Sequence, residues 1–208
     1  GETVLIHKSK YPWDVDVAVP YVAPLIDNLE DIRTENQINT IGTDECRAKI
    51  VEFQRAVLKN RNALVVEISK YANENEMSFT ELSTEEALEY AVLEFPFSFW
   101  QWGGSCEEIP DKTSSAKLMF EYINKIVGIS FYNDKTYYDL LPSYYQHTTE
   151  LGYYGFDTTP VKDLLQVVHN PANFRFAPKN VDLTYNLNYI KEVRDFVEYK
   201  GKKILYIY

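Results

Sequence analysis

The chain has 208 residues, of which 45% are apolar and 25% are charged, a composition typical of a folded protein with a substantial core. Its formal net charge is −10 and no cluster of Lys and Arg interrupts the acidic background, so we expect no nucleic-acid partner. Aromatic residues make up 15% of the chain and suit either a core or a pocket wall.

The N-terminal segment predicts a helix followed by a strand. Apolar residues at positions 4–6 precede a polar tail, and Tyr11-Pro12 ends the predicted helix. In the next stretch, VDVAVPYVAPL, three valines alternate on one face of a strand and two prolines mark its end or a bulge. These residues are Val15, Val17, Val19, Pro20 and Pro24.

Residues 28–185 carry mainly helical patterns. A capping box of Ser83 and Glu86 opens one predicted helix, and Thr159-Pro160 opens another over VKDLLQVVHN. Apolar stripes at helical spacing mark three further helices. They are Cys46, Ile50, Phe53 and Val57; then Leu64, Ile68 and Tyr71; then Leu118, Tyr122, Ile123 and Ile126 before Gly128.

The C-terminal segment predicts a helix with Leu187, Ile190, Val193 and Val197 on one face, a left-handed cap at Gly201, and a final strand KILYIY. The fold class is therefore α/β: both termini contribute to one sheet, interrupted by a large, mainly helical insertion. This order matches part of an α/β-hydrolase whose cap follows the strand after the nucleophile. We expect hydrolase segments at 1–27 and 186–208, and a cap at 28–185.

Metal, cofactor and disulfide chemistry receive little support from the sequence. The two cysteines, Cys46 and Cys106, are too few for a structural zinc site, and a bridge between them is as plausible as free thiols. The three histidines form no HExxH pattern. We expect no cofactor and no membrane span, and we find no signal peptide at the start of this chain.

A catalytic nucleophile is not evident within the chain. No G-x-S-x-G occurs, and the nearest match, GGSCE at 103–107, lacks the second glycine. Cys106 is followed by Glu107 rather than by an aromatic residue, which argues against a papain-like cysteine nucleophile. The adjacent Glu107 and Glu108 fit a solvated turn, the commoner fate of paired carboxylates, or a buried site for a substrate ammonium.

Four stretches resemble a known family. They are SKYPWDVDVAVPYVAPL, IGTDECRAKIVEFQ, LEFPFSFWQWGGSCEEIP and TTELGYYGFD, and they resemble the secreted tripeptidyl aminopeptidases, serine peptidases related to the prolyl carboxypeptidase and dipeptidyl peptidase group. The resemblance covers essentially the whole chain. It implies an enzyme, secreted or periplasmic, that removes short peptides from free N-termini through a Ser-Asp-His triad.

The resemblance also implies where the triad and the substrate site lie. The serine elbow would precede Gly1 and the Asp and His would follow Tyr208, so we expect this segment alone to be inactive and to act with the remainder of the hydrolase. Cap positions carry over as substrate contacts, but for Phe99, as for Phe95 and Phe97, which alternate as in a strand, core packing is the expected role. The predicted contacts are Phe99, Trp100, Gln101, Trp102, Glu107, Glu108, Tyr153 and Tyr154.

Two other readings remain open. A helical ligand-binding or protein-interaction domain without catalysis would share the helical patterns. A lipase-like or esterase-like cap would share the fold but would have a more apolar, less acidic pocket mouth, whereas the acidic balance mildly favours a cationic substrate end.

Overall fold

The computed structural model describes residues 1–26 and 28–208 and divides them into two compact units. The first, called the terminal unit here, comprises Gly1–Asp31, Ser143–Tyr154 and Ala177–Tyr208; the second, the helical unit, comprises Ile32–Pro142 and Gly155–Phe176. The sequence analysis expected the first hydrolase segment to end at residue 27, which lies outside the described residues. The terminal unit also takes in 28–31, 143–154 and 177–185, which the sequence analysis assigned to the helical insertion.

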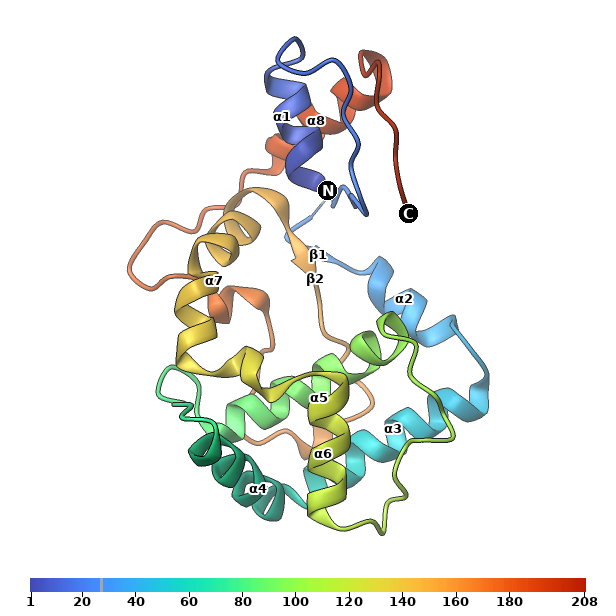
Figure 1. Cartoon of the computed structure of the whole chain (residues 1–208), viewed down its shortest axis with the longest axis vertical. Coiled ribbons are helices and arrows are strands. Elements are labelled where there is room, and N and C mark those ends of the chain that lie inside the picture. Colours follow the sequence, from blue (N-terminus) through green and yellow to red (C-terminus); the bar gives the residue numbers. More distant parts are fainter. Residues whose placement is uncertain (27) are drawn as a thin grey trace. The chain divides into compact units, whose positions relative to one another are not determined.

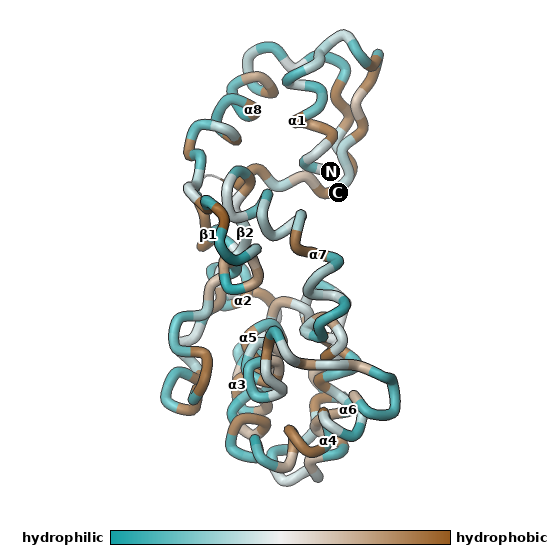
Figure 2. The backbone as a smooth tube through the Cα atoms, turned by 90° about the vertical axis from the view of Figure 1, so that its left-hand side faces the viewer, coloured by the Kyte–Doolittle hydropathy of each residue, from teal (hydrophilic) through white to brown (hydrophobic). Residues whose placement is uncertain are grey.

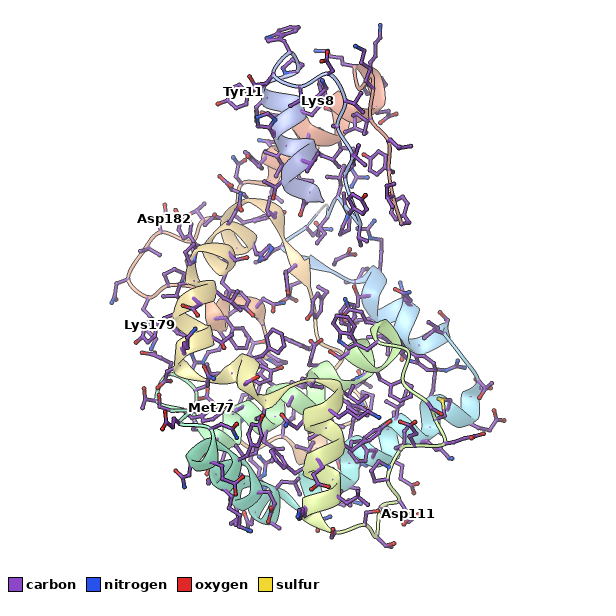
Figure 3. All side chains as sticks on the ribbon, viewed as in Figure 1. Lys8, Tyr11, Met77, Asp111, Lys179 and Asp182 are labelled. Atoms are coloured by element: carbon purple, nitrogen blue, oxygen red, sulfur yellow. A yellow bond between two sulfur atoms is a disulfide. The ribbon has the colours of Figure 1, made fainter. Side chains whose placement is uncertain are left out.

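The terminal unit begins with the expected helix, α1 (Glu2–Lys10), which ends before Tyr11. Lys8 is buried on α1, and its ammonium donates hydrogen bonds to the carbonyl oxygens of Pro12 at 2.7 Å and Val15 at 2.6 Å. Figure 3 labels Lys8 and Tyr11 at this end of the helix. A buried ammonium must find acceptors, so these bonds hold the turn that leads from α1 into the next segment.

The first and last extended segments of the chain lie side by side and parallel. Ala18 pairs with Ile204 and Tyr21 with Ile207. The backbone N–H of Leu205 donates to the oxygen of Ala18 at 3.0 Å, and that of Val22 donates to the oxygen of Ile207 at 2.9 Å. Figure 1 shows the two segments running together near the termini, and Figure 2 shows apolar residues along both. The prediction that these segments are neighbours is confirmed.

Helix α8 (Leu187–Tyr199) packs against α1 and completes the core of the terminal unit. Leu187 is exposed, so the buried face of α8 is narrower than predicted. The left-handed cap at Gly201 is wrong, because the left-handed residue is Lys203, at φ 58°. Gly201 allows close packing instead, since a Cβ there would lie 2.7 Å from the oxygen of Val197. The core residues are Leu5, Ile6, Ala23, Leu151, Ile190 and Val193.

A short parallel pair of strands, β1 (Glu30–Asp31) and β2 (Tyr153–Tyr154), joins two further segments of the terminal unit. Before β2 the chain forms α7 (Asp134–Gln146), inside which the unit boundary falls, and then a π-helical turn over His147–Leu151. Gly152 follows with φ +76°, and a Cβ there would meet the oxygen of Asn28 at 2.2 Å. Only glycine fits this approach without strain.

The helical unit is built around α5 (Thr84–Gln101), which packs against α3 (Asp44–Lys59), α4 (Arg61–Glu74) and α6 (Ala116–Ile126). The capping box predicted at Ser83 and Glu86 is confirmed. Helix α2 (Arg33–Thr40) and a 3₁₀ helix at Ile129–Tyr132 also contact α5. Buried aromatic residues link these elements, among them Phe53, Tyr90, Phe95, Phe99 and Tyr122.

One of the four positions predicted for the buried face of α6 is wrong. Leu118 is 47% exposed, and the neighbouring Met119 is fully buried in its place. Ser115 caps the helix by accepting from the backbone N–H of Leu118, which sets where the helix begins. The other three predicted positions, Tyr122, Ile123 and Ile126, are buried as expected.

The predicted helix over VKDLLQVVHN is wrong, since only Lys162–Leu164 forms a 3₁₀ turn. Side chains of neighbouring helices form hydrogen bonds with the backbone C=O and N–H groups that would otherwise pair within a helix. Arg55 donates to the oxygen of Pro160 and Arg61 to that of Leu164. The Glu89 carboxylate accepts from the backbone N–H groups of residues 166, 167 and 168, at 2.6, 3.2 and 2.7 Å.

Glu89 and Arg61 form a buried ion pair beneath this loop. Their side chains are 0% and 8% exposed, and Glu89 Oε1 lies 2.5 Å from the Arg61 guanidinium. The pair thus joins α5, α4 and the loop. A buried pair of this kind is tolerated because further hydrogen bonds satisfy the carboxylate.

We expect Glu89→Ala to lower the free energy of unfolding by about 3–5 kcal/mol, because it leaves the Arg61 cation buried without its partner. Urea denaturation checks this. Glu121→Gln is the control, because Glu121 and Lys117 are both well exposed and such pairs contribute about 0–1 kcal/mol. Equal effects of the two substitutions would contradict the structural role of Glu89.

Candidate functional site

The aromatic run that the sequence analysis singled out lies at the C-terminal end of α5, and Phe95, Phe97 and Phe99 belong to a helix rather than alternating as in a strand. Phe95 and Phe99 are fully buried, which confirms the core role expected for them. Phe99 lies against Gly104, where an added Cβ would come within 2.5 Å of the ring. Phe99 is therefore part of the packing that supports the site.

Trp100 is half-buried and lies against the turn between α2 and α3. A Cβ on Gly42, which has φ +69°, would come within 2.3 Å of the Trp100 ring. Two constraints therefore require glycine at position 42: the left-handed backbone and the aromatic ring above it. The close contact fixes the indole relative to the end of α2.

A small cavity of about 220 Å³ lies beside Trp100. We call it the α2–α5 pocket. It is lined by Gln37, Ile38, Ile41, Phe97, Trp100 and Gln101. Within the described part of the chain the Trp100 Nε1–H is buried and finds no acceptor. Two of the predicted substrate contacts, Trp100 and Gln101, thus line one cavity.

The other predicted contacts on this stretch are solvent-facing. Trp102 is 70% exposed. Glu107 is exposed, and the carboxylate of Glu108 forms an exposed ion pair with Lys125 at 2.9 Å. The two carboxylates lie in a solvated turn in this structure, which is the commoner arrangement considered from the sequence.

A disulfide joins Cys46, on α3, to Cys106, in the loop after α5, with 5.5 Å between the Cα atoms. The structure thus decides the question that the sequence left open. The bridge is visible as the yellow bond in Figure 3. It links the segment that carries Glu107 and Glu108 covalently to α3.

Tyr153 and Tyr154 form β2 in the terminal unit, whereas the predicted contacts from Phe99 to Glu108 belong to the helical unit. The two tyrosine rings stack at 4.4 Å, and the His147 ring lies 4.6 Å from that of Tyr153. Burial lowers the pKa of His147, so this imidazole is neutral at pH 7. π-Helical turns such as the one His147 begins are frequent at functional sites.

Glu2 is a candidate that the sequence analysis missed. Its Oε1 is buried and has no hydrogen-bond partner among residues 1–26 and 28–208. Burial raises the pKa of this carboxyl to about 7, against an opposing effect of the N-terminal ammonium. No pattern in the sequence marks Glu2, because its burial arises from tertiary packing.

Gly1 itself lies very close to the first extended segment. A Cβ at Gly1 would meet the oxygen of Tyr21 at 1.9 Å and that of Val22 at 2.8 Å. No side chain fits between α1 and this segment at that point. Glycine is therefore a steric requirement at position 1.

A larger cavity of about 830 Å³ runs along the outer face of α3. Four cations line it, but three of them are already engaged: Arg47 with Asp44, Arg55 with Asp163 and Lys112 with Glu52.

Among the described residues, no group of three or more His, Cys, Asp or Glu side chains is arranged to hold a metal ion. In the same part of the chain, every helix is too short or too polar to cross a membrane.

Comparison with known proteins identifies the family. The model of the PS-10 peptidase S37 family matches residues 1–208, and the chain belongs to this family. The chain is 27% identical over 214 residues to the prolyl tri/tetrapeptidyl aminopeptidase of Streptomyces mobaraensis. That alignment covers 100% of this chain but only 44% of the relative. No solved structure matches the chain significantly.

We expect replacement of both Cys46 and Cys106 by alanine to lower the free energy of unfolding by about 2–5 kcal/mol, because the bridge closes a long loop, with a sequence separation of 60. Denaturant unfolding with and without reductant measures the effect. Reductant destabilises the parent and leaves the double variant unchanged; a reductant-insensitive parent would contradict the bridge.

Proposed function

We propose that this chain is the cap-containing part of a secreted serine exopeptidase with an α/β-hydrolase fold, which releases short peptides from free N-termini. The observation that carries the proposal is the parallel pairing of residues 18–21 with 204–207. In the proposal these segments are neighbouring strands of one sheet, and everything between them is an insertion. Membership of the S37 peptidase family agrees with this arrangement.

The paired segments retain exposed apolar side chains that support a larger sheet. Tyr21 is 63% exposed and Leu205 is 57% exposed, although both belong to apolar stretches. Strands of a parallel sheet are normally covered on both faces. In the proposal these side chains pack against the remainder of the hydrolase, consistent with the 44% of the relative that the chain spans.

The close approach at Gly1 supports a nucleophile elbow just before α1. An elbow turns sharply from a strand into a helix and uses glycines where backbone segments pack tightly. The helix after Gly1 and the steric requirement for glycine both fit this geometry. In the proposal the serine precedes Glu2 by a few residues, and its Asp and His also belong to parts of the protein outside these 208 residues.

In the proposed reaction the serine attacks the scissile carbonyl, a histidine accepts and returns the proton, and backbone N–H groups stabilise the oxyanion. The chain described here binds and orients the peptide and is inactive by itself. The helical unit is the proposed cap, with substrate contacts at Trp100, Gln101 and Trp102, supported by Phe99, and at Tyr153 and Tyr154 from the terminal unit. The disulfide supports export, because such bridges persist in oxidising compartments.

Recognition of a free N-terminus requires a group that attracts an ammonium. The proposed groups are the carboxylates of Glu107 and Glu108, and the structure adds Glu2 as a candidate. A buried carboxyl without a partner gains more from an ammonium than an exposed one, because water screens the charge less there. Glu2 meets this condition within the described residues, whereas Glu108 already pairs with Lys125.

We expect a fluorophosphonate probe to label one serine of the full-length protein, a few residues before Glu2. Peptide mass spectrometry locates the modified residue. A chain of residues 1–208 alone serves as the control and remains unlabelled. Labelling of Ser105, or failure of the full-length protein to react, would favour the ligand-binding or interaction domain instead.

We expect carboxylate substitutions in the full-length enzyme to distinguish the proposed ammonium contacts. Glu2→Gln, or Glu107→Gln with Glu108→Gln, raises KM for free-amine peptides and spares N-acetylated ones if the group binds the ammonium. Glu121→Gln, on the exposed face of α6, is the matched control. Equal changes with both substrate types would remove the substituted carboxylate from recognition.

We also expect a pH dependence from Glu2. Because its pKa is raised to about 7, the carboxyl is protonated below that pH and gains its charge as the pH rises. KM for free-amine peptides therefore falls as the pH increases through about 7, and Glu2→Gln flattens this change. The native state also holds this proton more tightly than the unfolded chain, whose carboxyl has the ordinary value of 4.5, so stability falls as the pH rises from 4.5 to about 7. Glu2→Gln removes this part of the pH dependence of unfolding.

A further inference from the structure

The cavity on the outer face of α3, called the α3 cavity here, gathers positive charge in an acidic chain. The formal net charge of the chain is −10, yet the cavity lining contains four cations, Arg47, Arg55, Lys59 and Lys112. Glu52 is the one carboxylate among the described residues that line it. A hollow whose lining has the opposite sign of charge from the rest of the chain favours an anionic ligand.

The two arginines of the lining are held by the protein itself. Both guanidinium nitrogens of Arg55 donate to the carboxylate of Asp163, each at 2.7 Å. Arg47 donates to the carbonyl oxygens of Ile41 at 2.8 Å and Gly42 at 3.0 Å. These bonds fix both groups, so the arginines contribute to the potential of the cavity and the lysines are left to contact a ligand.

The two lysines of the lining are available. Lys59 is exposed, and its ammonium forms no ion pair within residues 1–26 and 28–208. Lys112 pairs with Glu52 at 2.8 Å, and the two side chains are 61% and 50% exposed. Because water screens exposed ion pairs, they contribute little, and a ligand anion can replace the carboxylate beside Lys112.

The wall that carries Lys112 is fixed to α3. It belongs to the loop between α5 and α6, which runs along α3 (Figure 1). The Cys46–Cys106 disulfide links this loop to α3, and the Lys49 ammonium donates to the oxygen of Cys106 at 3.4 Å. A wall that is already held in place lowers the entropic cost of binding.

The uncharged part of the lining narrows the chemistry of the ligand. The amide oxygens of Asn39 and Asn60 and the hydroxyl of Thr113 can accept hydrogen bonds from sugar hydroxyl groups. No aromatic residue is among the described residues of the lining, so a nucleobase finds no ring on which to stack. The volume of about 830 Å³ is also far larger than a phosphate ion needs.

We propose that the α3 cavity binds a sugar phosphate, with Lys59 and Lys112 contacting the phosphate group. A phosphate monoester carries a charge of about −1.5 to −2 at pH 7 and has three acceptor oxygens, which suits two ammonium groups. Glu52, released from Lys112, accepts from a sugar hydroxyl. The site does not depend on the proposed function, because none of its lining residues is among the proposed substrate contacts.

The test titrates the full-length protein with glucose 6-phosphate in a phosphate-free buffer and follows the heat by calorimetry. Glucose, inorganic phosphate and AMP are the comparison probes. We expect saturable one-site binding of glucose 6-phosphate, weaker binding of inorganic phosphate and AMP, and no binding of glucose. The charge thus supplies attraction and the hydroxyl groups supply selectivity.

Three variants separate the lysines from the cavity. We expect Lys59→Gln and Lys112→Gln each to raise Kd about 10-fold, because each removes one charged donor. Ala48→Phe, at an exposed position of the lining, fills the cavity without changing the charge and abolishes the binding heat. Lys117→Gln is the matched control, since Lys117 is a well-exposed cation of α6 outside the lining, and it leaves Kd unchanged.

Circular dichroism confirms that each variant is folded. The absence of saturable heat in the wild type, or AMP binding as tightly as glucose 6-phosphate, would overturn the sugar-phosphate site. Equal losses of affinity in the Lys59→Gln and Lys117→Gln variants would show diffuse attraction of charge instead, and an unchanged Kd in Ala48→Phe would place the ligand elsewhere. Serine labelling reports on the proposed function separately, so either proposal can fail alone.

Discussion

The parallel hydrogen bonds between residues 18–22 and 203–207 are the constraint on which the functional interpretation depends. Parallel strands cannot be joined by a tight turn, so the chain needs a crossover between them. Here α1 precedes one extended segment and α8 precedes the other, and these helices share a core. The whole helical unit therefore lies in the chain between two extended segments that pair in parallel.

Within the helical unit, charged side chains fix a loop that hydrophobic patterning alone would have made helical. Glu89 and the two arginines Arg55 and Arg61 hold the backbone between residues 160 and 168 in a non-helical path. In the region of the candidate site, tertiary packing likewise determines the local structure. Gly42 and Gly104 each lie against an aromatic ring of α5. Because neither glycine has a side chain, the rings can occupy these positions.

The sequence predicted the elements whose signals are local and missed those that depend on distant partners. The Ser83–Glu86 capping box and the face of α3 followed from spacing, and the pairing of the terminal segments followed from the order of a helix and an extended segment at each end. The loop at residues 160–168 did not, because its partners lie up to 108 positions away in the chain. Likewise, neither the α2–α5 pocket nor the burial of Glu2 has a local signature, since both arise from tertiary packing.

The Cys46–Cys106 bridge has a practical consequence for anyone who handles this protein. The covalent link spans the loop beyond α5, so material synthesised in a reducing cytosol would carry two thiols there instead. Such preparations would share the amino-acid sequence but not the covalent structure. Their stability would then depend on how the sample was produced as well as on its amino-acid sequence.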